Sequence, residues 1–303
     1  MEYNEYLRLT ERLTSRLIND PPVFSFTEEE LSSFRKSLGS DTLSALYDAG
    51  LYDGDFEKFC FVYRLCEETG VWEDADTEFL RALFTNAKKH IRAEFLNDPY
   101  IKNIRIPYVK EGDVTLMNAV YDKGEAFLYD MPDLFADVVF PKIGYFDERV
   151  YFPAVYEKEM PWVSVCPSEI NSMKDQVSSA HGKTLVLGLG LGYYAYAVSE
   201  KEEVRSVTVI EINPTITGLF EKHILPQFAR KDKIRVITSD AVAFLENVSL
   251  GEYDFVFADI WEGQEDGAPL YKKIKTFEKN LPGTEFTYWI EDQIRWYSAR
   301  NKQ

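Results

Sequence analysis

The first hundred residues place apolar side chains at helical spacing. Leu9, Leu13 and Leu17 recur at every fourth position, which aligns them along one helix face. Thr27 is followed three positions later by Glu30, a capping-box pattern that begins a helix. Together these patterns predict a helical N-terminal region over 1–97, with helices at 5–18, 27–38, 41–50, 55–70 and 76–96.

Between residues 98 and 165 the pattern changes to short runs of β-branched and aromatic residues. Gly, Asp and Pro separate these runs, as they separate the strands of hairpins. The next segment, "PSEINSMKDQVSSAHGK" at 167–183, has the pattern of one helix that ends in a turn. We therefore predict a small antiparallel β unit over 98–165, with strands at 103–109, 114–121, 124–130 and 149–157.

From residue 184 onward, apolar runs of strand length alternate with helical patterns. Such alternation implies a parallel sheet with helices on both faces, so we predict an α/β, Rossmann-like domain over 166–303. Only a short helical segment follows the fifth run, which predicts a sheet truncated after strand 5. The N-terminal region or a second subunit, as in a homodimer, would cover its free edge. The predicted strands are 184–190, 206–212, 234–240, 253–260 and 285–291.

Three glycines, Gly188, Gly190 and Gly192, lie where the first of these strands meets its helix. Glycine allows a sharp turn and the close approach of a ligand to the backbone. The spacing is GxGxG, and Tyr193 stands where the third glycine of a dinucleotide motif would fall. This counts against a pyrophosphate cofactor, but an adenosine attached to an amino acid needs no diphosphate grip.

An acidic residue ends each of the next three strands: Glu211, Asp240 and Asp259. Open α/β sheets bind their ligands outside the carboxyl ends of the strands. A carboxylate at Glu211 can accept hydrogen bonds from both ribose hydroxyls, and one at Asp240 can meet an adenine amino group. The glycines and carboxylates together predict a ligand that carries a nucleoside.

Residues 184–262 resemble a class I S-adenosylmethionine-dependent methyltransferase of the spermidine-synthase-like branch. The segment "TLVLGLGLGYYAYAVSEKEEVRSVTVIEIN" can be laid on that branch's first βαβ unit without a gap. The resemblance implies S-adenosylmethionine as the cofactor and catalytic roles for Asp259 and Glu262. It implies cofactor contacts from Gly188, Gly190, Gly192, Glu211, Ile212, Asp240, Ala241 and Asp259.

Besides the sheet truncated after strand 5, the chain departs from the spermidine-synthase pattern at two places. The D-x-x-D stretch of that branch is here Asp259-Ile260-Trp261-Glu262, so bulky residues separate the two carboxylates. The helix before the glycines keeps Glu169 but has Met173 where the branch has Gln. The candidate substrate residues are Tyr193, Tyr194, Trp261 and Glu169.

Three functional hypotheses remain open at this point. The chain is a methyltransferase that acts on a small molecule, an aminopropyl transferase that uses Asp259 as base, or a cofactor-binding protein without catalysis. A carboxylate poised to accept an amine proton would favour the first two. A pocket plugged by Tyr193, Tyr194 or Trp261 would favour the third.

Composition narrows the class of ligand. The net charge of −17 disfavours nucleic acid and suits a cationic or neutral small molecule. The three histidines and three cysteines show no metal-ligand spacing, so no metal site is predicted. No signal-peptide pattern and no membrane-length apolar run is present, which predicts a cytoplasmic protein.

One further motif is set aside. "NDPY" at 97–100 is similar to the D/N-P-P-Y motif of amino-group methyltransferases, but it precedes the glycine loop and lacks the second proline. We interpret it as a helix stop.

Overall fold

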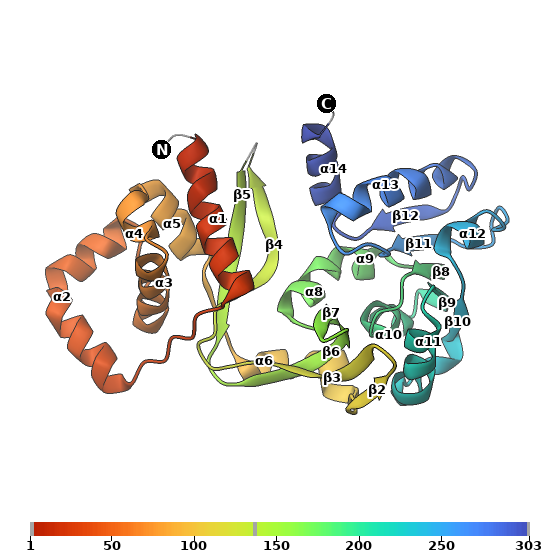
Figure 1. Ribbon diagram of the computed structural model, residues 1–303, viewed down its shortest axis with the longest axis horizontal. Coiled ribbons are helices and arrows are strands. Elements are labelled where there is room, and N and C mark those ends of the chain that lie inside the picture. Colours follow the sequence, from red (N-terminus) through yellow and green to blue (C-terminus); the bar gives the residue numbers. More distant parts are fainter. Residues whose placement is uncertain (1–2, 136–137, 302–303) are drawn as a thin grey trace. The chain divides into compact units, whose positions relative to one another are not determined.

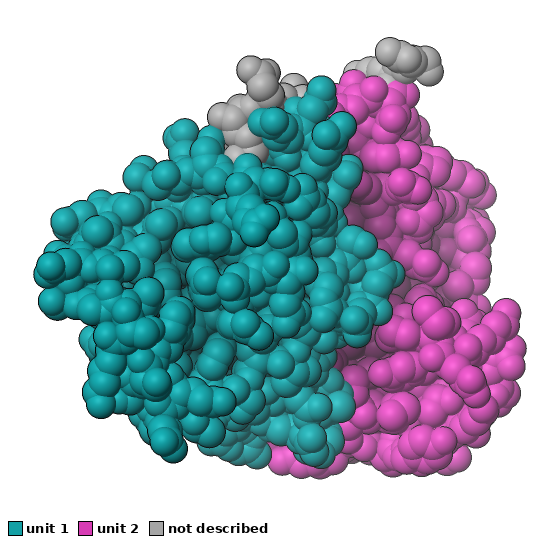
Figure 2. All heavy atoms as spheres, turned by 60° about the vertical axis from the view of Figure 1, so that its left-hand side comes forward, with its two compact units in different colours: residues 1–96, 120–151 teal, residues 97–119, 152–303 magenta. Residues whose placement is uncertain are grey.

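A computed structural model describes residues 3–135 and 138–301. The chain forms two compact units, one of residues 1–96 and 120–151, the other of 97–119 and 152–303 (Figure 2). The segment predicted as one β unit, 98–165, is therefore shared between the two units. Its strands belong to two separate sheets.

The first unit packs helices with a three-stranded sheet of order β1-β5-β4 (Figure 1). Its core is rich in aromatic side chains: Phe59 stacks on Phe56, Tyr63 and Phe84 with ring centroids 5.6–6.0 Å apart. The elements are α1 (Tyr3–Asn19), α2 (Glu28–Asp48), α3 (Phe56–Glu68), α4 (Val71–Asp74), α5 (Thr77–Asn86), β1 (Lys88–His90), α6 (Arg92–Phe95), β4 (Phe127–Phe135) and β5 (Val138–Phe146).

The helix predicted over 76–96 is interrupted after Asn86 and resumes only as the short helix α6 (Arg92–Phe95). The helix α5 ends at Asn86, and Lys88–His90 instead pairs in parallel with Gly144–Phe146 of β5. The strand β5 carries no prediction of its own, because the segment contains a proline and lacks a simple alternation. Tertiary pairing thus overrides the helix propensity of the two lysines.

The capping box predicted at Thr27 is confirmed. The Thr27 hydroxyl accepts the Glu30 N–H at 3.2 Å, and the Glu30 carboxylate accepts the Thr27 N–H at 2.8 Å. The two helices predicted over 27–38 and 41–50 run on as α2, with a kink at Gly39 (φ +75°).

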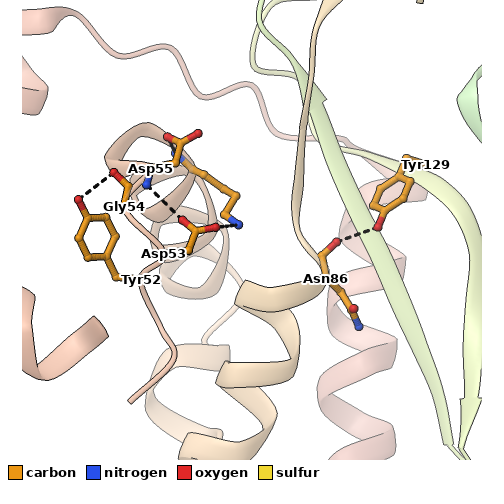
Figure 3. Close-up of polar contacts among 7 residues, drawn as sticks. Tyr52, Asp53, Gly54, Asp55, Asn86 and Tyr129 are labelled. Carbon is orange, nitrogen blue, oxygen red and sulfur yellow. Dashed lines mark hydrogen bonds and ion pairs between the residues drawn. The ribbon is translucent and has the colours of Figure 1, made fainter. Parts of the chain in front are cut away.

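Short polar contacts fix the turn that leads into α3 (Figure 3). The Tyr52 hydroxyl donates to the Gly54 carbonyl at 3.0 Å, and the Asp53 carboxylate accepts the Asp55 N–H at 3.2 Å. In the same view the Tyr129 hydroxyl donates to the Asn86 carbonyl at 3.0 Å. That bond ties β4 to the end of α5, so these contacts serve the fold of the first unit.

The second unit begins with a short helix and a four-stranded sheet of order β2-β3-β6-β7. The pairs β2–β3 and β6–β7 are antiparallel. Between β7 and the parallel sheet, the predicted single helix is broken at Met173 into two. The elements are α7 (Pro99–Asn103), β2 (Val109–Glu111), β3 (Val114–Tyr121), β6 (Val150–Glu157), β7 (Met160–Ser164), α8 (Pro167–Ser172) and α9 (Lys174–Ser179).

The rest of the second unit is a Rossmann-like α/β fold, as predicted. Its five strands are all parallel, in the order β10-β9-β8-β11-β12, and are coloured green to blue in Figure 1. The strands are β8 (Gly182–Leu187), β9 (Val204–Glu211), β10 (Ile234–Thr238), β11 (Phe255–Ala258) and β12 (Glu285–Tyr288). The connecting and final helices are α10 (Tyr193–Ser199), α11 (Pro214–Leu219), α12 (Ala241–Leu245), α13 (Gln264–Lys275) and α14 (Glu291–Arg300).

Burial follows the strand order. All four residues of β11 are buried, and five of the six residues of the central strand β8 are. The edge strand β10 has no buried residue, and β12 has one. Strands covered on both faces are continuous apolar runs, which is why the sequence pattern located them well. Among the described residues, this sheet ends at β12, as the prediction of five strands required.

The described residues contain neither a membrane-spanning helix nor a cluster of metal ligands. No helix in the described part of the chain is both long and apolar enough to cross a membrane. Within residues 3–135 and 138–301, no three metal-ligating side chains of His, Cys, Asp or Glu gather at one point.

Candidate functional site

The second unit contains a cavity of about 640 Å³ at the carboxyl ends of its parallel strands. The order reversal between β8 and β11 creates a crevice at this end of such a sheet. Twelve of the thirteen candidate residues from the sequence line this cavity. They are Glu169 from α8, Gly188, Gly190, Tyr193, Tyr194, Glu211, Ile212, Asp240, Ala241, Asp259, Trp261 and Glu262.

The exception is Gly192, which lies behind the cavity wall. Its φ is +73°, and a Cβ atom at this position would lie 2.3 Å from Cε2 of Phe220. Gly192 precedes α10 and lets the chain turn against that ring. Close packing against Phe220 thus requires a glycine here, and Gly192 is absent from the lining of the cavity, where the resemblance implied a cofactor contact.

Gly188 brings two strand ends together at the cavity. Its φ is +99°, and a Cβ atom would lie only 1.9 Å from the carbonyl oxygen of Asp259. No side chain fits in that space, so the end of β8 approaches the end of β11 only because residue 188 is glycine. The glycine thus places Asp259 beside the loop.

Glu211, the last residue of β9, is a buried carboxylate with a fixed orientation. Its side chain is 6% exposed. One oxygen accepts the Leu189 N–H at 3.1 Å, and the other accepts the Asn213 N–H at 2.8 Å. A carboxylate has about four acceptor positions, so each oxygen keeps one for a ligand.

The residues after β9 and β10 form the neighbouring wall. One oxygen of Asp240 accepts the Ala243 N–H at 2.8 Å and caps α12, so this carboxylate also has a set orientation. The next residue, Ala241, is buried, and Ile212 is 68% exposed. An exposed isoleucine and a small buried residue leave room for a flat apolar group.

Asp259 and Glu169 form a pair of carboxyl groups with no cation beside them. In the described part of the chain neither side chain makes a hydrogen bond or an ion pair with another residue. Burial raises the pKa of Glu169 to about 7. Burial also raises the pKa of Asp259 well above its usual range, and the charge of Glu169 adds to that rise. A positively charged ligand would relieve both effects.

Glu262 differs from this pair, because it is exposed at the rim of the cavity. The neighbouring backbone is fixed by Asp266, whose two oxygens accept the N–H groups of Glu262 and Gly263 at 2.8 and 2.9 Å. The sequence paired Asp259 with Glu262, but the carboxyl group that is electrostatically coupled to Asp259 is that of Glu169.

The aromatic candidates line the cavity without filling it. The Tyr193 hydroxyl donates to Asp98 at 3.1 Å, and the Tyr194 hydroxyl donates to the Gln176 carbonyl at 2.9 Å. Trp261 is buried and lies parallel to Tyr288, with ring centroids 6.5 Å apart. Because both tyrosine hydroxyls already have protein partners, the carboxyl groups are the better candidates for a base.

Sequence reasoning missed two tryptophans of the cavity wall, Trp162 from β7 and Trp289 from the end of β12. The Trp289 indole donates to the Ser172 hydroxyl at 2.9 Å, and that hydroxyl donates to the Glu169 carbonyl at 2.9 Å. The only available signal for Trp289 was its place at a strand's carboxyl end. No local pattern marks Trp162, because β7 reaches the cavity through tertiary packing.

The charge of the cavity wall has one sign. The acidic residues on it are Glu169, Glu211, Asp240, Asp259, Glu262 and Asp266. None of the described residues that line the cavity is Lys, Arg or His. The site therefore favours cationic over anionic ligands.

A hollow of similar volume lies along α1 in the first unit, where two of the arginines that line it already have acidic partners. Arg12 contacts Asp74 at 2.6 Å, and Arg16 contacts Asp20 at 2.7 Å. The cavity of the second unit is the better candidate site, because its carboxyl pair has no such partners.

Comparisons with known proteins add little to this geometry. No family model matches the sequence, and no curated protein matches it either. The chain is similar to the structure of precorrin 8w decarboxylase from Methanobacterium thermoautotrophicum, with 18% identity and a TM-score of 0.30 over 38% of this chain and 58% of that one. It is also similar to spermidine synthase from Thermotoga maritima, with 10% identity and a TM-score of 0.35 over 50% and 59% of the two chains. The chain thus spans less than two thirds of either neighbour.

Proposed function

We propose that the protein is an S-adenosylmethionine-dependent methyltransferase that acts on a small cationic amine. The observation that carries this proposal is the coupled pair Glu169 and Asp259, two carboxyl groups without a cation in a cavity that also holds Glu211. The proposal joins a nucleoside-binding end of the cavity to an amine-binding end.

The residues at the first end suit the adenosine part of this cofactor. The free acceptor positions of Glu211 would take the two ribose hydroxyls, and the uncapped oxygen of Asp240 would take the adenine amino group. Ile212 and Ala241 would enclose the base. When bound, the cofactor would supply a methyl group attached to a positively charged sulfur, and the sulfur would keep the electrons of the carbon–sulfur bond that breaks.

The residues at the second end suit the acceptor. An ammonium ion is unreactive until it loses a proton, so the site must both attract the cation and accept that proton. Glu169 and Asp259 do both, because their raised pKa values make them stronger bases than ordinary carboxylates. Gly188 and the loop after it would help to orient the attacking nitrogen toward the methyl donor.

A second candidate function, transfer of an aminopropyl group from decarboxylated S-adenosylmethionine, is favoured by one observation. No Lys, Arg or His among the described cavity residues offers a partner for the α-carboxylate of the ordinary cofactor. The decarboxylated donor lacks that group. The aromatic residues leave the cavity open, which supports either transferase over a binding protein without catalysis.

Calorimetric titration with S-adenosylmethionine, S-adenosylhomocysteine and decarboxylated S-adenosylmethionine tests these proposals. We expect binding of the first two, weakened about 100-fold in Glu211→Ala, since that change removes two ligand hydrogen bonds and leaves the N–H groups of Leu189 and Asn213 unpaired. Glu246→Ala removes the same charge from an exposed site on this unit and serves as the control. Preference for the decarboxylated donor would support the second candidate, and no binding of any of the three would refute both.

A further inference from the structure

The segment Asn97–Tyr100, which has no role in the proposed function, packs against the glycine loop. Asp98 caps α7, since one of its oxygens accepts the N–H groups of Tyr100 and Ile101 at 2.9 and 3.1 Å. The sequence predicted a helix stop at this segment, and α6 does end just before it, at Phe95. The segment also begins the next helix, α7, at Pro99.

Tyr100 holds the backbone of the loop. Its side chain is 1% exposed, and its hydroxyl donates to the Leu191 carbonyl at 2.6 Å. Leu191 lies between Gly190 and Gly192 and lines the cavity. A carbonyl in so short a glycine-containing turn has few other partners, so this bond determines how the turn is oriented.

Asp98 holds the side chain that follows the loop. Its second oxygen accepts the Tyr193 hydroxyl at 3.1 Å, and Tyr193 also lines the cavity. A single carboxylate thus caps α7 with one oxygen and positions a wall of the cavity with the other.

An aromatic cluster keeps the segment against the loop. The Tyr100 ring lies 5.6 Å from that of Tyr193, 5.5 Å from that of Tyr196 and 6.3 Å from that of Phe228. Phe228 in turn contacts Phe220, the ring that Gly192 accommodates. The loop is therefore held between α7 and Phe220.

We propose that Asp98 and Tyr100 are positioning residues of the cavity, which hold residues 190–193 in the shape that binds the ligand without contacting it. Neither residue lines the cavity. The expected effect on ligand binding rests on the proposed function, whereas the effect on the loop itself does not.

Tyr100→Phe tests the proposal, because it removes one hydroxyl and keeps the ring. The matched control is Tyr196→Phe, which removes a hydroxyl of the same cluster that bonds Asn103 and Pro99 and makes no bond to the loop. In Tyr100→Phe we expect faster amide hydrogen exchange over 188–196 and about tenfold weaker binding of S-adenosylhomocysteine. In Tyr196→Phe we expect loop exchange unchanged and binding within about twofold.

Asp98→Ser is the second variant, because serine still caps a helix but is too short to reach Tyr193. It should weaken binding while α7 stays folded. Equal effects of Tyr100→Phe and Tyr196→Phe on loop exchange, or no effect of Tyr100→Phe, would overturn the proposal. If the wild-type protein binds no S-adenosylhomocysteine, the proposed function fails, and the exchange comparison alone still supports or overturns the positioning role.

Discussion

The two ends of the cavity hold their carboxyl groups in opposite ways. At one end Glu211 gives each oxygen a backbone N–H, so its charge is compensated before any ligand arrives. At the other end Asp259 and Glu169 have no such donors, burial raises the pKa of both, and the charge of Glu169 adds to the rise at Asp259. A compensated carboxylate suits neutral hydroxyl groups, whereas an uncompensated pair suits a cation. The same residue type thus serves two kinds of recognition, depending on the donors around it.

The largest expected effect comes from a substitution at Gly188, where the ends of β8 and β11 approach each other. Gly188→Ala would place a methyl group 1.9 Å from the Asp259 carbonyl oxygen at a φ of +99°. We expect the free energy of unfolding to fall by about 4 kcal/mol, because both the clash and the backbone conformation are unfavourable. Chemical denaturation measures this.

The control for that change is Gly218→Ala in α11, where an added Cβ meets nothing within 4 Å. Alanine is the better helix former, so stability should stay the same or rise by up to about 1 kcal/mol. Equal stability of Gly188→Ala and the wild type would contradict the close approach of β8 and β11.

An intermediate effect is expected from the uncompensated pair as the pH changes. The pKa of Glu169 lies near 7 in the folded protein against an ordinary value of 4.5, so the folded state retains a proton that the unfolded state has released. The free energy of unfolding should therefore fall as the pH rises from about 4.5 to 7. Glu169→Gln should make this pH dependence shallower by about 1–3 kcal/mol over that range.

Denaturation at several pH values measures this difference, with exposed Glu246→Gln as the control. The affinity for a cationic amine should change in the other direction and increase as the pH rises through 7, since the ionised pair attracts the cation more strongly. If the free energy of unfolding depends on pH in the same way in Glu169→Gln and the wild type, the carboxyl group of Glu169 is not enclosed beside Asp259.

The smallest effect is expected at the rim. Glu262 is exposed, and its side chain makes no bond to another described residue. Glu262→Gln should change stability by less than about 0.5 kcal/mol and amine affinity by less than about threefold, because solvent screens exposed charges. If calorimetric titration shows that Glu262→Gln weakens amine affinity tenfold or more, Glu262 belongs to the amine site and its predicted pairing with Asp259 is supported.

The parallel sheet and the residues at its carboxyl edge could both be predicted from the sequence. Buried parallel strands are continuous apolar runs, and the residue that ends each run must lie at that edge, so Gly188, Glu211, Asp240 and Asp259 could be grouped without a structure. The capping box at Thr27 was equally legible, because its hydrogen bonds are local.

Features that depend on long-range contacts could be seen only in the folded chain. The coupling of Asp259 to Glu169, the place of Trp289 beside them and the contact of Asp98 and Tyr100 with the glycine loop join segments that lie far apart in the chain. The pairing of Lys88–His90 with β5 likewise replaced a helix that local propensity favoured. Local patterns report the conformation of a segment and the side it buries, but not which other segment it packs against, because packing depends on the whole chain.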